Sequence, residues 1–202
     1  MRGQNFLHPD LEFQLTFPPD WRTLNQKTAV LAQPPKRDAL FELTLSGATS
    51  PRAAAEAFLA EEGMRGGPVR GGSVHGHEAA SAGFRAETQQ GAVEGLVVFV
   101  AFRGGVYRLL GYAPRDRWGA YQQAIRSTIG SFERLTDQEA LNVQPMRIDV
   151  VEVTTPMTVR EFVARESSPV SVESVALLNQ LEPGARLERG QLVKRVVGQT
   201  PP

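Results

Sequence analysis

Leu96–Phe102 has the sequence LVVFVAF and Val106–Tyr112 has the sequence VYRLLGY, with Arg103-Gly104-Gly105 between them. Two apolar runs separated by a glycine-containing break are typical of a β-hairpin, because tight hairpin turns need positive φ angles. The first run is apolar at every position, so both faces of its strand are expected to be covered, one by a helix and the other by a helix or loop. We expect this hairpin at the centre of a sheet.

Further elements are expected on both sides of the hairpin. Ser50-Pro51 is typical of a helix start and Gly63 of a helix end. The glycine-rich segment 63–76 is expected to be a loop that leads into short strands. The periodicity predicts strands at 13–17, 28–32, 39–46 and 79–88, with 28–32 and 39–46 paired, and helices at 53–62 and 118–130. The predicted order is therefore β-β-β-α-β-β-β-α, an α+β fold with helices packed on an antiparallel sheet.

A second, smaller module is expected after a linker. In the linker, a capping box at Thr136–Glu139 predicts a short helix that Pro145 ends. In the module, a strand is predicted at 147–153, followed by a helix that a capping box at Thr158–Glu161 starts. A second helix starts at Ser171 and carries Val175, Leu177 and Leu178, and a turn at Pro183-Gly184 leads to a strand at 191–197. We predict a domain at 1–135, a linker at 136–146, a β-α-α-β module at 147–198 and a tail at 199–202.

Composition limits the classes of partner. Lys plus Arg and Asp plus Glu both number 22, so the chain has no overall field for nucleic acid. The chain has no Cys, which excludes disulfides, thiolate catalysis and cysteine-bound zinc. Its apolar runs are shorter than the roughly 20 residues of a membrane helix, so no membrane insertion is expected. Met1–Asn5 lacks the apolar stretch of a signal peptide, so no targeting signal is expected.

Catalytic signatures are weak throughout. His75 and His77 stand two residues apart and could share an ion on a strand, but a third ligand is missing, and ordinary exposed histidines are the favoured interpretation. No Gly-x-Ser-x-Gly motif accompanies a serine nucleophile. Gly66-Gly67 and Gly71-Gly72 lack the Gly-Lys-Ser/Thr of a phosphate loop and favour a flexible loop. We therefore predict no enzyme, no catalytic or metal-binding residue and no cofactor in this chain.

Short motifs in a fixed order run through most of the chain: Asn5–Phe13, Phe17-Pro18-x-x-Trp21, Ser50-Pro51, Gly105–Arg108 and Ser131–Thr136. This order resembles the region that follows the catalytic domain in bacterial zinc metallopeptidases of the HtpX/CAAX-protease-like superfamily. The superfamily's His-Glu-x-x-His motif does not occur here. The resemblance therefore implies a non-catalytic C-terminal region, with zinc only in a catalytic domain of the parent protein and a periplasmic or cell-envelope location.

The two modules have separate resemblances. The first is similar in strand order and in its Phe17-Pro18-x-x-Trp21 opening to PsbP-like domains. Residues 147–198 resemble a LysM module through Leu178-Asn179 and Gly190-Gln191, although the usual Gly-Asp-Thr-Leu of the first loop stands here as Thr155–Val159. LysM modules bind N-acetylglucosamine polymers between two loops. The residues that this resemblance implies for glycan or partner binding are Thr155, Pro156, Met157, Thr158, Leu181, Glu182, Pro183 and Gly184.

Two functions follow as hypotheses. In the first, the chain is a binding or regulatory region that docks on peptidoglycan, on a protease catalytic domain or on a protein substrate. In the second, it is a free-standing PsbP-like assembly or interaction protein without a protease.

Overall fold

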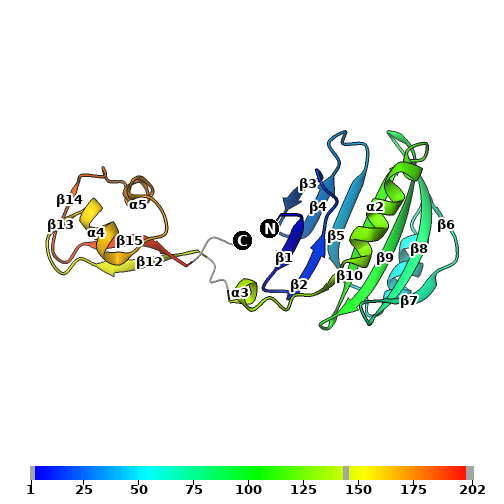
Figure 1. The fold of residues 1–202 in the computed structure, drawn as a ribbon, viewed down its shortest axis with the longest axis horizontal. Helices are drawn as coiled ribbons and strands as arrows, with labels where there is room; N and C mark the ends of the chain where they lie inside the picture. The colour runs from blue at the N-terminus through cyan, green and yellow to red at the C-terminus, as the bar shows by residue number, and fades with distance from the viewer. Residues whose placement is uncertain (1–2, 143–145, 199–202) are drawn as a thin grey trace. The chain divides into compact units, whose positions relative to one another are not determined.

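The chain forms two compact units, Met1–Leu135 and Thr136–Pro202. The computed structural model describes residues 3–142 and 146–198, and Figure 1 shows the fold of each unit. The predictions that concern Met1-Arg2, the helix end at Pro145 and the tail at 199–202 lie outside the described residues.

The first unit is a mixed α+β structure with two antiparallel sheets. Its strands are β1 (Asn5–His8), β2 (Phe13–Thr16), β3 (Arg22–Asn25), β4 (Ala29–Gln33), β5 (Leu40–Ser46), β6 (Met64–Gly66), β7 (Arg70–Val74), β8 (His77–Thr88), β9 (Gly91–Phe102), β10 (Gly105–Pro114) and β11 (Glu133–Arg134), and its helices are α1 (Pro51–Leu59) and α2 (Trp118–Gly130). The large sheet has the order β3-β4-β5-β10-β9-β8-β6, with β7 also paired to β8, and the small sheet has the order β1-β2-β11.

The predicted central hairpin is confirmed as β9 and β10, which pair from Gly105 opposite Phe102 to Pro114 opposite Val93. The turn between them consists of Arg103, with φ 48°, and Gly104, with φ 81°. Two successive positive φ angles are the geometry that matches the twist of a two-residue hairpin. The predicted pairing of the strands that became β4 and β5 is also confirmed.

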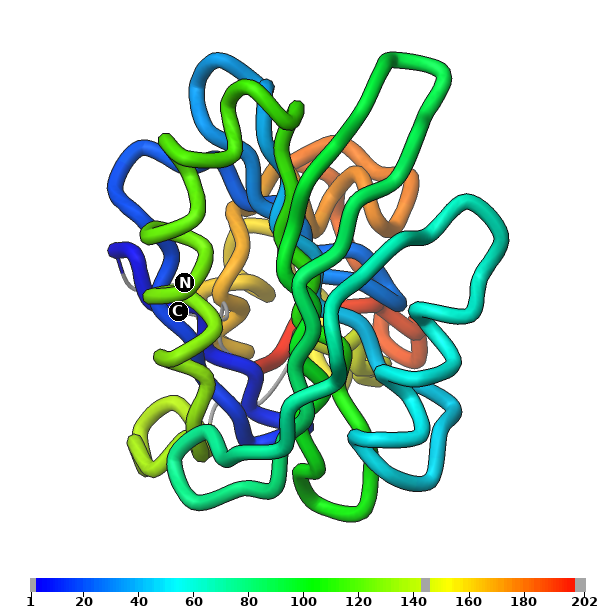
Figure 2. Tube along the Cα trace, turned by 90° about the vertical axis from the view of Figure 1, so that its right-hand side faces the viewer, coloured from blue at the N-terminus to red at the C-terminus, as the bar shows by residue number. Residues whose placement is uncertain are grey.

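Both faces of the central strand are covered by a helix, as its apolar sequence predicts. Val98 and Val100 belong to a core cluster that includes Ile125 and Ile129 of α2 and reaches the small sheet. Val97 and Phe99, on the opposite face of β9, belong to a second cluster with Phe58 of α1. Figure 2 shows α2 and α1 on opposite sides of these strands. Alternate side chains of one strand thus supply two separate cores.

The helix start at Ser50 is confirmed, because its side chain accepts a hydrogen bond from the Ala53 amide at 3.2 Å. The end predicted at Gly63 is wrong: α1 ends at Leu59, and Ala60 caps it in a right-handed conformation. The segment 63–76, for which a loop leading into short strands was predicted, contains the short strands β6 and β7. These glycine-rich strands form because β8 is twelve residues long and offers its backbone to both.

The described part of the second unit contains two two-stranded antiparallel sheets and three helices. Its elements are α3 (Gln138–Leu141), β12 (Arg147–Glu152), β13 (Met157–Thr158), α4 (Val159–Glu166), α5 (Val172–Leu178), β14 (Arg186–Leu187) and β15 (Leu192–Val197). Strand β12 pairs with β15, and β13 pairs with β14. A core of Val153, Val159, Phe162, Val175, Ala176, Leu187 and Val193 lies between them.

Two details of the second unit differ from the sequence prediction. Leu177 was expected on the apolar face of its helix, but it is 79% exposed, because the neighbouring Val175 and Ala176 take the buried face. The first capping residue is Asp137 and not Thr136: its carboxylate accepts hydrogen bonds from the amides of Glu139 and Ala140.

Candidate functional site

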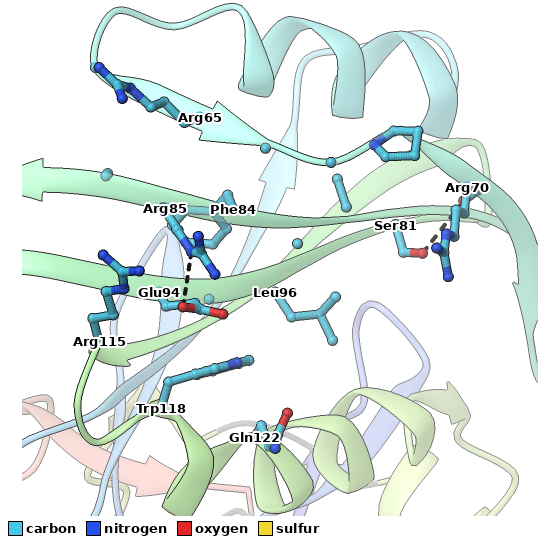
Figure 3. Close-up of a pocket in the computed structure, with 18 of the residues that line it drawn as sticks. Arg65, Arg70, Ser81, Phe84, Arg85, Glu94, Leu96, Arg115, Trp118 and Gln122 are labelled. Carbon is cyan, nitrogen blue, oxygen red and sulfur yellow. Dashed lines mark hydrogen bonds and ion pairs between the residues drawn. The ribbon is translucent and has the colours of Figure 1, made fainter.

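A groove of about 790 Å³ lies on the face of the large sheet that carries α2. Its floor is formed by β8 and β9, one wall by the first half of α2, and the other wall by β6 and the segment that leads to β7 (Figure 3). We call it the arginine groove, and it is lined by Gly63, Arg65, Gly66, Gly67, Pro68, Arg70, Ser81–Glu87, Glu94–Leu96, Arg115, Trp118, Gln122 and Arg126. All of these residues belong to the first unit.

The alternation of β8 decides which side chains reach the groove. Ala80, Ala82 and Phe84 are buried in the core beneath α1. Ser81 and Arg85 therefore project from the opposite face, because successive side chains of a strand alternate. Gly83 lies between them with its backbone exposed and no side chain to fill the floor, so the groove stays open.

Positive charge is concentrated in the groove of a chain that is neutral overall. Its lining contains five arginines against two glutamates, an excess of three positive charges. The arginines are Arg65, Arg70, Arg85, Arg115 and Arg126, all of them exposed. Figure 3 shows Arg65, Arg85 and Arg115 toward one end and Arg70 toward the other. The arginines come from β6, the start of β7, β8, the turn after β10, and α2.

Only one of these arginines has a carboxylate partner. Arg85 Nε lies 3.0 Å from Glu94 Oε2, because the register of β8 and β9 places the two residues directly opposite each other. Within the described ranges 3–142 and 146–198, the other four guanidinium groups make no ion pair. Arg65 is directly opposite Arg85 across β6 and β8. Like charges at such a position destabilise a sheet, and the ion pair of Arg85 with Glu94 reduces this repulsion in the free protein.

Sequence reasoning missed the arginine groove. Its arginines are spread over more than sixty positions of the sequence, so no window of residues has a strong positive charge. A local signal did exist: Arg65-Gly66-Gly67 is followed by Arg70-Gly71-Gly72, which combines cations with small residues. Glycine at such positions allows close approach of a ligand to the backbone.

The residues predicted for glycan binding are in the second unit, on two loops that lie side by side. Met157 and Thr158 form β13 and pair with β14, and the Val159 amide donates a hydrogen bond to the Ala185 carbonyl at 3.0 Å. The Ala185 amide in turn donates to the Glu182 carbonyl at 2.9 Å. The loop at 155–158 is therefore joined to the loop at 181–184 through the backbone.

The eight predicted residues differ in their exposure. Thr155, Pro156, Glu182 and Gly184 are exposed, and Pro183 is half-buried. Met157 and Leu181 pack against the core of the second unit. A ligand on this surface therefore has mainly the four exposed residues and the loop backbone to contact.

Thr158 is occupied by a capping box that starts α4. Its hydroxyl accepts from the Glu161 amide at 3.2 Å, and its own amide donates to Glu161 Oε2 at 2.7 Å. Hydrogen bonds from the Thr158 backbone and side chain lower the pKa of the Glu161 carboxyl. The amide and the hydroxyl of Thr158 thus both make hydrogen bonds to Glu161, which hold the end of the first loop at the start of α4.

His75 and His77 make separate contacts. His75 lies in the turn between β7 and β8, with φ 46°, and its Nε2 is 2.9 Å from the Gly130 carbonyl. Its Nδ1 is 3.5 Å from a Glu133 oxygen. The His77 ring packs against Phe102, with centroids 4.9 Å apart. Across the described part of the chain, no group of three or more metal-ligating side chains lies close enough to hold an ion.

None of the helices in the described part of the chain combines the length and apolarity needed to cross a membrane.

Comparison with known proteins identifies the fold. No protein-family model matches the chain, and the search of curated proteins gave no significant match. Among solved structures, cyanobacterial PsbP (CyanoP) from Synechocystis sp. PCC 6803 is similar with a TM-score of 0.50 and 13% identity, over 65% of this chain and 91% of that protein. A protein from Bacteroides thetaiotaomicron VPI-5482 is similar with a TM-score of 0.50 and 14% identity, over 88% of this chain and 60% of that protein.

The share matched to CyanoP is close to the share of the first unit, 135 of 202 residues. The chain therefore contains a PsbP-like fold.

Proposed function

We propose that this chain is a non-catalytic binding protein of the cell envelope, in which a PsbP-like domain is followed by a LysM-like module that docks on N-acetylglucosamine polymers such as peptidoglycan. The observation that carries the proposal is the backbone junction of the two loops, the hydrogen bond from the Val159 amide to the Ala185 carbonyl. A binding surface made from two loops needs such a connection, because loops that move independently lose entropy when a ligand orders them.

A side chain in the second unit supports this arrangement. Asn179 donates to the Lys194 carbonyl at 2.7 Å and accepts from the Lys194 amide at 2.8 Å. The same amide group also donates to the Val175 carbonyl at 2.8 Å. Asn179 thus fastens the end of α5 to β15, which holds the start of the loop at 181–184. The order β12-α4-α5-β15 also agrees with the proposed module.

Ligand titration tests the glycan proposal. The full chain, labelled with ¹⁵N, is titrated with a soluble N-acetylglucosamine hexamer and with peptidoglycan fragments. We expect amide shifts at Thr155, Glu182 and Gly184. Replacing both Thr155 and Glu182 by Ala should weaken binding about thirtyfold, since two hydrogen bonds of about 1 kcal/mol each are at stake. Ala164→Ser, at an exposed position of α4, is the control. If no resonance of either loop moves at millimolar glycan, the proposal fails.

A further part of the proposal is that the chain is the accessory region of a zinc metallopeptidase. Docking would then raise the local concentration of the protease at its substrate without chemistry in this chain. Zinc would be bound only by the parent's catalytic domain, and the partners would be that domain, its protein substrate or envelope glycan. The intact mass of the endogenous protein tests this. A mass well above 22.1 kDa, with His-Glu-x-x-His in the additional sequence, is the expected result.

A free-standing assembly or interaction protein is the second candidate. The observation in its favour is the similarity to CyanoP, which covers 91% of that protein and therefore a whole PsbP-like domain. An endogenous mass near 22.1 kDa would favour this candidate and contradict the metallopeptidase parent. Fractionation of source cells tests the proposed envelope location, because recovery with the soluble cell interior would exclude it.

A further inference from the structure

We infer that the arginine groove binds a small phosphorylated ligand that carries phosphate groups at both ends. This inference is independent of the glycan proposal, because the groove belongs to the first unit and the proposed glycan loops belong to the second.

The spacing of the arginines indicates two anion positions. Arg65, Arg85 and Arg115 lie toward one end of the groove, with the Arg65 side chain turned away from the other two (Figure 3). Arg70 and Arg126 are at the other end, where both also line a smaller adjoining hollow of about 240 Å³ with Ser81. Ser81 and Arg85 are four residues apart on β8, so the two groups are anchored about 13 Å apart at roughly 3.3 Å per residue. A ligand that satisfies both groups must be extended and anionic at each end.

Phosphate fits each end better than a carboxylate. A phosphate monoester carries about −1.5 to −2 charge and three acceptor oxygens, so it can receive hydrogen bonds from two or three guanidinium groups at once. A carboxylate carries one charge and two acceptor oxygens, and the Glu94 carboxylate in the groove pairs with one guanidinium group, that of Arg85, among the described residues. The fork of a guanidinium group also matches phosphate geometry with two parallel hydrogen bonds.

The size and lining of the groove favour a small molecule over a nucleic acid. A volume of about 790 Å³ falls in the range of small-molecule sites, about 300 to 1,000 Å³. Proteins that bind single-stranded nucleic acid present exposed aromatic rings on which bases stack. The two aromatic side chains of this lining, Phe84 and Trp118, are buried, with relative exposures of 4% and 9%. The charged atoms are available to a ligand, and the rings are not.

Binding would also change the charge balance of the cross-strand pair Arg65 and Arg85. Arg85 already has Glu94 as a counterion, so a bound anion mainly supplies one for Arg65. Glu94 competes with such an anion for Arg85. Removing its charge should therefore strengthen phosphate binding, an effect that damage to the fold cannot imitate.

The test uses two extended probes with one anionic group at each end of an alkyl chain. Calorimetry of the full chain at 150 mM salt compares 1,8-octanediol bisphosphate with decanedioate. We expect the bisphosphate to bind and the dicarboxylate to bind at least about tenfold more weakly. Arg70→Gln and Arg126→Gln should each weaken bisphosphate binding about tenfold, the effect of one lost charge-assisted hydrogen bond. Glu94→Gln should strengthen it.

The matched control is Arg22→Gln, which removes the same charge from β3 at the far edge of the same sheet. Tryptophan fluorescence checks that each variant is folded. An effect of Arg22→Gln equal to that of Arg70→Gln would overturn the inference, because binding would then follow the overall charge. Equal affinity for the two probes would overturn the phosphate assignment, and weaker binding by Glu94→Gln would exclude Arg85 from the site.

Discussion

Replacing Gly111 by Ala should destabilise the first unit, because α2 packs directly on this glycine. An added Cβ atom would lie 2.3 Å from Cγ2 of Ile125 and 3.0 Å from its Cδ1. Non-bonded carbon atoms prefer about 3.5 to 4.0 Å, so the side chain or the helix must move by more than about 1 Å. Ile125 is fully buried in the core, so its side chain can move only by displacing its neighbours.

The size of the effect follows from overpacking. An extra methyl group in a well-packed core costs about 1 to 3 kcal/mol, and the lower backbone entropy of Ala returns about 0.5 to 1 kcal/mol. We expect a net loss of about 1 to 2 kcal/mol in the free energy of unfolding. With an m-value of about 2 kcal/mol/M in urea, the midpoint should fall by about 0.5 to 1 M.

The assay isolates the first unit. The chain contains two tryptophans, Trp21 and Trp118, and both belong to this unit. Urea unfolding followed by tryptophan fluorescence therefore reports on the first unit, even if the second unfolds separately. The control is Gly119→Ala in α2, the helix that packs on Gly111. An added Cβ at Gly119 meets nothing within 4 Å, so the urea midpoint should stay the same or rise slightly.

A double-mutant cycle shows whether the clash with Ile125 is the cause. Ile125→Ala alone should cost about 3 kcal/mol, from lost burial and the cavity left behind. In the double variant with Gly111→Ala the new methyl group occupies part of that cavity, so the loss should be at least about 1 kcal/mol smaller than the sum of the single losses. Additive losses, or an unchanged midpoint for Gly111→Ala, would refute this packing of α2 and with it the wall of the arginine groove.

Two further predictions concern hydrogen bonds that depend on protonation or capping. Thr158→Ala should destabilise α4 by about 1 kcal/mol, measured as faster amide hydrogen exchange in that helix. The pKa of the Glu161 carboxyl is lowered from 4.5, so the stability that this carboxylate gives to α4 should be present above that pH and be lost as the pH falls through the folded pKa. In Thr158→Ala the exchange rates should depend less on pH over this range. The same dependence in both proteins would contradict the prediction. His8 has a lowered pKa, mainly through burial, and its Nδ1 accepts from the Leu11 amide at 3.3 Å. As the pH falls, the unfolded chain therefore binds a proton at His8 before the folded protein does, so the urea midpoint should fall as the pH decreases below about 6.5. His8→Asn should make the midpoint less dependent on pH. An NMR titration that gives His8 a pKa above 6.5 would contradict the prediction.

The elements that could be predicted from the sequence are those with a strong local signal. The hairpin of β9 and β10 has two apolar runs and a turn with glycine, and the helix starts at Ser50 and Thr158 have side chains that cap the backbone directly. Each of these depends on a few neighbouring residues. Neither hairpin nor helix start needs a distant partner to be recognised.

Elements that depend on a partner could not be predicted in the same way. β7 has the sequence RGGSV, which lacks strand periodicity. It becomes a strand because residues 77–81 of β8 supply hydrogen bonds to it along the edge of β8 that does not pair with β9. The sequence of β12 shows clear alternation but does not show which face of the strand is buried. Ile148 and Val150 are 58% and 54% exposed, while Val151 and, just after the strand, Val153 face the core. Both sides of that strand carry apolar residues, so only packing decides which is buried.

The arginine groove also limits what net charge can exclude. Equal numbers of acidic and basic residues argue against a long polyanion, which responds to charge over the whole surface. A small ligand responds mainly to charges within a Debye length, about 8 Å at physiological salt. Within the groove, the register of β8 and β9 places Glu94 opposite Arg85, where it neutralises that charge, and the other four arginines of the lining can bind a ligand. A neutral chain can therefore present a strongly cationic site, and the pairing of its strands, more than its composition, determines which anion it can hold.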